Sequence, residues 1–144
     1  MASDFNSKLL LNVPPTRDGL IHETDAGRLA GLRYRLLAMF GADLASGPGR
    51  TTADEHSREV DLTPSSRLAF VRLSEDIAQG QSVAAHVVSG FDGNTWVELA
   101  RGTTVGYARI HSIGSARVFE RLRVSVDDYA GPPRAPRIRA YAPA

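Results

Sequence analysis

The sequence contains no cysteine, so this 144-residue chain forms neither disulfides nor thiolate metal sites, and its redox compartment stays undetermined. No stretch reaches 18 consecutive apolar residues, which argues against a membrane-spanning helix. Residues 1–4 lack the basic start and apolar core of a signal peptide. We therefore expect a soluble chain of undetermined compartment, with no secretion signal in these residues.

Lysine is almost absent as well, because every basic residue except Lys8 is an arginine. The net charge is +1, and so weak a field favours neither nucleic acid nor an anionic membrane as a partner. Aromatic residues make up only 7%, with a single Trp, whereas 42% hydrophobic residues is ordinary for a globular protein. The length suffices for one domain but not for a full (β/α)-barrel, which needs roughly 200–250 residues.

The start of the chain predicts one strand and one helix. Residues 9–13 are apolar apart from Asn12, as in a strand covered on both faces, and Pro14 and Pro15 end it because neither donates to a ladder. Apolar residues then recur at helical spacing over residues 24–40. A lone strand and helix cannot bury their apolar faces, so they must dock on the sandwich described next, on another copy, or on another domain.

Two details of this helix matter for its packing. Thr24 and Asp25 are the expected N-caps. Gly27 and Gly31 lie four residues apart on one face, where each costs about 1 kcal/mol relative to alanine. Their placement predicts a close approach of the helix to a sheet.

The rest of the chain predicts strands. Residues 118–126 alternate, with Val118, Leu122, Val124 and Val126 on one face and arginines on the other. Residues 83–91 also alternate, and we assign one face to Val83, Ala85, Val87, Ser89 and Phe91. The fold class is therefore mainly β, an antiparallel β-sandwich of jelly-roll or galactose-binding-like type preceded by one strand and one α-helix. We divide the chain into a β–α unit (1–45), a linker (46–56) and a sandwich domain (57–144).

Three landmarks in this order resemble the C-terminal part of glycoside hydrolase family 29 α-L-fucosidases, where the last barrel strand and helix precede a β-sandwich. They are Asn12-Val13-Pro14-Pro15 with Asp18-Gly19-Leu20-Ile21, Leu73-Ser74-Glu75-Asp76-Ile77 with Gly80-Gln81-Ser82-Val83, and Trp96-Val97-Glu98-Leu99-Ala100 with Gly102-Thr103-Thr104-Val105-Gly106-Tyr107. Two positions depart from the family pattern: Ala108 stands where the family often has Lys, and His111 where it commonly has an apolar residue.

The resemblance implies a parent enzyme that retains configuration, with two carboxylates about 5 Å apart. In the family both carboxylates precede the last barrel strand, so no catalytic residue and no cofactor are expected in this chain. The implied role is an accessory segment that braces a catalytic barrel lying outside this truncated sequence. Helix 24–40 would then pack on that barrel or drive self-association.

Carbohydrate binding is a second hypothesis, in which the chain is a free-standing module for fucosylated glycans. The candidate residues are Trp96, Arg109, His111, Asn94 and Asn12. An aromatic face beside Arg, His and Asn donors suits sugars. The alternative readings are that Trp96 belongs to the core or rim of a hairpin and that Asn12 only satisfies backbone groups.

A third hypothesis, a small autonomous α-L-fucosidase, would need a facing pair of acids. Glu75 and Asp76 are adjacent, and neighbours on a strand point to opposite faces, so we expect them to bond turn amides or an arginine. Glu98 and Glu120 could approach each other across a sandwich, although no motif says so.

The histidines show no metal-ligand spacing, and no metal site is expected from them. We expect each to be exposed or hydrogen-bonded, with His86 facing solvent. Asp92 and Asn94 could serve a calcium ion, but Asp-Gly-Asn is more typical of a hairpin turn.

Overall fold

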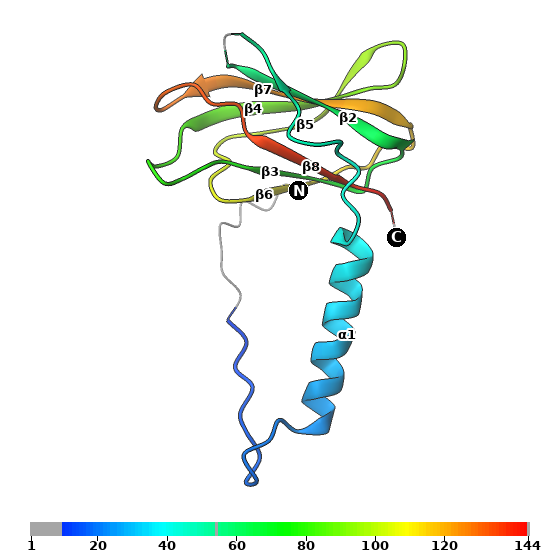
Figure 1. The fold of residues 1–144 in the computed structure, drawn as a ribbon, viewed down its shortest axis with the longest axis vertical. Helices are drawn as coiled ribbons and strands as arrows, with labels where there is room; N and C mark the ends of the chain where they lie inside the picture. The colour runs from blue at the N-terminus through cyan, green and yellow to red at the C-terminus, as the bar shows by residue number, and fades with distance from the viewer. Residues whose placement is uncertain (1–9, 54, 144) are drawn as a thin grey trace.

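The strands that follow the helix pair into two antiparallel sheets. Our computed structural model describes residues 10–53 and 55–143, and Figure 1 shows their arrangement. Within this part the strands are β1 (Arg50–Thr51), β2 (Ser57–Ser66), β3 (Phe70–Ser74), β4 (Val83–Phe91), β5 (Trp96–Gly102), β6 (Arg109–Ser112), β7 (Phe119–Tyr129) and β8 (Arg137–Tyr141). One sheet has the order β1-β2-β7-β4-β5 and the other the order β6-β3-β8.

The core lies between these two sheets, as the alternation predicts. On β7, Leu122, Val124 and Val126 are buried while Arg121 and Arg123 lie on the opposite face. The opposing sheet contributes further buried residues, Val71, Leu73, Ile138 and Ala140. The predicted antiparallel sandwich with a preceding helix is thus confirmed, whereas its jelly-roll type and the three-part division stay predictions.

The face assignment of residues 83–91 is wrong for most of the strand. Val83 is buried, but the inward residues farther along β4 are His86, Val88 and Gly90, with Val87 and Phe91 only partly covered. The register between β4 and β7 shifts on either side of Ala85. A β-bulge inserts one residue, and a shift of one residue moves every following side chain to the other face.

The end of β7 nearest the preceding loop holds a second departure from the alternation. Val118 is 51% exposed, and Phe119 is buried in its place. Phe119 packs close to Gly90, where an added Cβ would lie 2.6 Å from its Cδ1 atom. A glycine therefore makes room for the largest fully buried side chain of the core.

The predicted strand at the start of the chain is not formed in the described residues. Residues 10–14 are irregular, and only Pro15 and Ile21 make an isolated bridge; residue 9 lies outside the described part. Leu10 is 93% exposed. A strand needs a neighbour for its backbone groups, and no described strand runs beside this segment.

The predicted helix over residues 24–40 is confirmed as α1 (Glu23–Phe40). Its N-cap is His22, whose Nδ1 accepts from the Thr24 N–H, so the expected caps Thr24 and Asp25 are wrong. Asp25 instead forms an ion pair with Arg28 within the helix. The helix extends away from the sandwich along the long axis of the molecule (Figure 1).

Candidate functional site

The most unusual surface belongs to α1, because none of its residues is buried. An 18-residue helix with an apolar stripe normally covers a core. Here the exposed apolar side chains include Leu32 (37%), Leu36 (47%), Leu37 (57%) and Tyr34 (77%). The segment before the helix adds Leu10, Leu11, Leu20 and Ile21, all at least half exposed. We call α1 and residues 10–22 together the uncovered unit.

Contacts at the end of α1 attach this unit to the three-stranded sheet. The Phe40 ring lies 5.3 Å from the Phe70 ring and 5.1 Å from the Tyr141 ring, the latter edge to face. The Ala140 N–H donates to Asp43 Oδ1 at 3.0 Å, and Leu44, just beyond, is buried in the core. The C-terminal end of α1 is therefore attached to the sandwich at β3 and β8.

The five predicted glycan-binding residues are not brought together. Arg109 and His111 lie on β6 and are buried, with 8% and 2% exposed. Trp96 opens β5 in the other sheet, Asn94 lies in the exposed turn before it, and Asn12 lies in the segment before α1. Carbohydrate binding by these residues stays a prediction.

Trp96 instead belongs to the outer face of the five-stranded sheet. Its ring lies 5.3 Å from that of Phe91, across the β4–β5 pair. The Arg123 guanidinium lies over the Trp96 ring at 4.0 Å, and that of Arg121 lies 4.3 Å from the Phe91 ring. Part of the aromatic surface that a sugar would need is thus already in contact with arginines.

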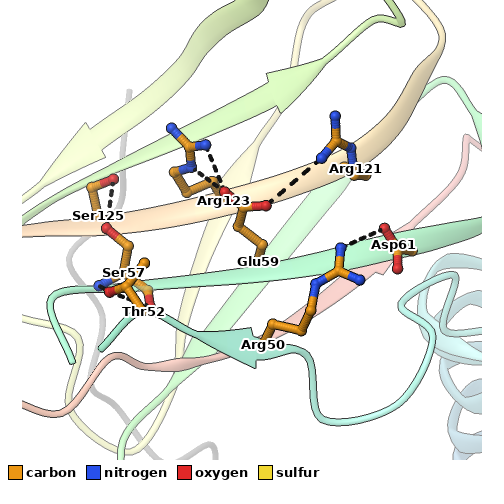
Figure 2. A network of polar contacts seen from close by, with 8 residues as sticks. All are labelled: Arg50, Thr52, Ser57, Glu59, Asp61, Arg121, Arg123 and Ser125. Atoms are coloured by element: carbon orange, nitrogen blue, oxygen red, sulfur yellow. Dashed lines mark hydrogen bonds and ion pairs between the residues drawn. The ribbon is translucent and has the colours of Figure 1, made fainter. Parts of the chain in front are cut away.

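A polar network holds these arginines in place, as Figure 2 shows. Glu59 on β2 forms ion pairs with Arg123 and Arg121, with N···O distances of 2.6 and 3.8 Å. Beside it, Arg50 pairs with Asp61 at 3.3 Å across β1 and β2. The network joins neighbouring strands on the outer face of the sheet. The Arg50–Asp61 pair is exposed and contributes little by itself, whereas the ion pairs of Glu59 are partly buried.

Buried histidines link the two sheets at the opposite, inner face. His86 Nε2 and His111 Nε2 are 2.9 Å apart, and His86 Nδ1 lies 2.7 Å from the Thr103 carbonyl oxygen. The expectation that His86 faces solvent is wrong, because the bulge in β4 turns it inward. Burial lowers the pKa of His86, and the charge of Arg109 adds to this, while the Thr103 carbonyl, Asp127 and Glu75 oppose it.

The predicted structural role of Glu75 is confirmed. Its carboxylate accepts from the N–H groups of Ser82, Val83 and Gly106 at 2.7–2.9 Å. Asp76 accepts from the Ala78 N–H at 3.1 Å. Neither carboxylate is arranged as half of a facing acid pair.

Glu98 and Asp92 also have structural partners. Glu98 forms a two-point ion pair with Arg101, with both hydrogen bonds at 2.8 Å. Asp92 accepts from the N–H groups of Asn94 and Thr95, which confirms the hairpin turn. These backbone bonds, followed by the charge of Arg117, lower the pKa of Asp92.

In residues 10–53 and 55–143, no group of three or more histidine or acidic side chains could hold a metal ion. No helix there combines the length and the apolar character that crossing a membrane requires.

Comparison with known proteins agrees with the resemblance. No family model and no curated protein sequence matches the chain. Among solved structures, a candidate α-L-fucosidase from Bacteroides ovatus is 33% identical, with a TM-score of 0.79, over 95% of this chain and 24% of its own. A glycoside hydrolase 29 family member from an unknown rumen bacterium is 26% identical, with a TM-score of 0.77, over 96% of this chain and 26% of its own.

A third solved structure, the Ruminococcus gnavus GH29 fucosidase in complex with fucose, shares the fold at 22% identity and a TM-score of 0.72. The match covers 34% of that protein and 96% of this chain. The chain thus spans about a quarter to a third of these relatives. Such coverage is consistent with the predicted C-terminal part. The resemblance is confirmed: the chain is a segment related to the family 29 α-L-fucosidases.

Proposed function

We propose that this chain is the accessory β-sandwich segment of an α-L-fucosidase-like retaining glycoside hydrolase, and that it braces a catalytic barrel. The observation that carries the proposal is the uncovered unit, whose helix α1 has no buried residue although its Phe40 end packs on the sandwich. Apolar surface of this extent marks a site of protein contact. The barrel would supply the two catalytic carboxylates.

The glycines of α1 support a close contact with the barrel. An added Cβ at Gly27 or Gly31 would meet nothing within 4 Å in this chain. The predicted close approach to a sheet is therefore not made within the described residues. In the proposal, a barrel strand approaches the helix backbone at these two positions.

Truncating a full-length relative tests the bracing role. We expect removal of the sandwich, the equivalent of residues 57–144, to lower the melting temperature while leaving the turnover of the surviving folded enzyme nearly unchanged. Differential scanning calorimetry and fucosidase kinetics measure the two quantities separately. A truncated relative that melts at the temperature of the intact enzyme would refute bracing.

A second experiment uses the chain itself. By sedimentation velocity, we expect the chain to self-associate or to bind a separately produced family 29 barrel through the uncovered unit. Leu36→Asp should abolish both associations because it places a charge on the apolar stripe. Ala38→Asp adds the same charge on the opposite side of the helix, beside Gly27 and Gly31, and tests the close approach at these glycines separately. A chain that stays monomeric and ignores the barrel would contradict the proposal.

An autonomous enzyme would release nitrophenol from an aryl α-L-fucoside. Under the accessory role, we expect the homogeneous chain alone to release none. Turnover that is abolished by changing one of its own carboxylates, such as Glu98 or Glu120, would overturn the accessory role.

A further inference from the structure

A cavity of about 760 Å³ opens at one end of the sandwich, away from α1. It lies between the loop after β3 and the loop before β8, which are joined where Ser82 Oγ donates to the Pro132 carbonyl oxygen at 2.6 Å. Small-molecule sites in proteins occupy roughly 300–1,000 Å³. The cavity is therefore large enough for one or two sugar rings.

Arginines from separate elements line this cavity. Arg58 comes from β2, Arg137 opens β8, and Arg134 lies in the loop before it. Arg58 is partly buried, and its Nε and Nη1 donate to the carbonyl oxygens of Ala135 at 3.3 Å and Pro48 at 2.7 Å. Burial, followed by the nearby charge of Arg137, lowers the pKa of Arg58. Arg58 is thus held in place by neutral groups beside a second positive charge.

None of these three arginines has a carboxylate partner among the described residues. Ion pairs are formed elsewhere by Arg28, Arg50, Arg101, Arg117, Arg121, Arg123 and Arg139. Three acids also line the cavity, so the formal charge of its lining is balanced, but none of them forms an ion pair with these arginines. Glu75 is engaged by backbone amides, Asp76 caps its own loop, and Glu55 makes no ion pair in the described part.

We propose that this cavity binds an acidic sugar, with the sulfate or carboxylate group held by Arg58, Arg134 and Arg137. Guanidinium groups match the planar geometry of oxyanions and bond them at two points. A bare inorganic ion would fill little of the space, whereas a sugar ring can also reach the side-chain amides of Gln79 and Gln81. The site contains no residue of α1, so this proposal and the bracing role can each fail without the other.

The test is an NMR titration of the ¹⁵N-labelled chain at constant ionic strength. The probes are a sulfated monosaccharide, glucuronic acid, inorganic sulfate and neutral fucose. We expect saturable shifts at the two loops for at least one acidic sugar, weaker binding of inorganic sulfate, and no response to fucose. Equal affinity for inorganic sulfate and the acidic sugars would overturn the sugar assignment, and no saturable shift with any anion would overturn the site.

Variants connect the binding to the arginines. Arg137→Ala and Arg134→Ala remove exposed side chains that make no hydrogen bond or ion pair among the described residues, so the fold should survive. Each should weaken binding by about tenfold or more, the effect of losing one charge-assisted hydrogen bond. Arg139→Ala, on the same strand but outside the cavity, is the charge-matched control. Equal losses in Arg139→Ala and Arg137→Ala would show a general charge effect and refute the proposal.

Discussion

Removing the Glu75 carboxylate should destabilise the sandwich more than removing any other surface-accessible acid considered above. Glu75 follows β3, and its two oxygens bond three backbone amides from two distant segments. Oε1 accepts from Ser82 and Val83 at 2.8 and 2.9 Å, and Oε2 accepts from Gly106 at 2.7 Å. The Glu75 N–H in turn donates to the Gly106 carbonyl oxygen at 2.9 Å. One side chain therefore joins β3, the start of β4 and the loop before β6.

The expected magnitude follows from these bonds. A hydrogen bond to a charged group contributes about 1.5–3 kcal/mol net. Bonds that share one side chain are not additive, so we expect Glu75→Ala to lower the free energy of unfolding by about 3–5 kcal/mol. Glu75→Gln keeps one oxygen for Ser82 and Val83, but its amide group faces the Gly106 N–H as a second donor. Glu75→Gln should lower the free energy of unfolding by about 1.5–3 kcal/mol.

Urea unfolding at pH 7 measures these differences, with Asp76→Ala as the neighbouring control. Asp76 is exposed and bonds a single amide, that of Ala78, so its removal should lower stability by about 0.5–1 kcal/mol. The slope of the unfolding free energy against urea concentration should be the same in all variants if the substitutions affect only the native state. Equal losses for Glu75→Ala and Asp76→Ala would refute the argument that Glu75 holds the two segments together.

Other variants test the core, the helix and the histidine bridge. Gly90→Ala should destabilise the chain by about 1–3 kcal/mol in urea unfolding, because its Cβ would crowd the Phe119 ring. Gly31→Ala, which meets open space, should instead raise helix stability by about 1 kcal/mol; a loss would contradict the absence of a contact within the chain. Because burial lowers the pKa of His86, the stability that its neutral form provides is present above its ordinary value of 6.5 and is lost as the pH falls toward the lowered value. The free energy of unfolding of His86→Gln should depend less on pH between pH 7 and 5 than that of the unchanged chain. An equal pH dependence would contradict the lowered pKa of His86.

Local chemistry made several elements predictable. The helix over residues 24–40 follows from apolar spacing, and the turn at residues 92–95 follows from Asp-Gly-Asn. Both depend on interactions between residues close in the sequence. The inward face of β7 was also predictable, because its alternation continues without interruption from Leu122 to Val126.

Other features depend on pairing between distant residues. The bulge at Ala85 arises from the match between β4 and β7, and it decides that His86 meets His111 inside the core. No local pattern marks such a shift, since His86 sits among residues that alternate acceptably in either phase. The arginine-lined cavity likewise combines residues from β2, β8 and two loops, which only the packing of the sheets brings together.

The sequence by itself determined the class of the fold, the position of the helix and the order of landmarks shared with fucosidases. These features reflect short-range periodicity and turn chemistry, which act along the chain. Only the tertiary structure decided which face of β4 is buried, that α1 lies uncovered, and that Arg58, Arg134 and Arg137 share one cavity. Each of these depends on which distant segments pack together, because register and packing are set by partners that a local pattern does not contain.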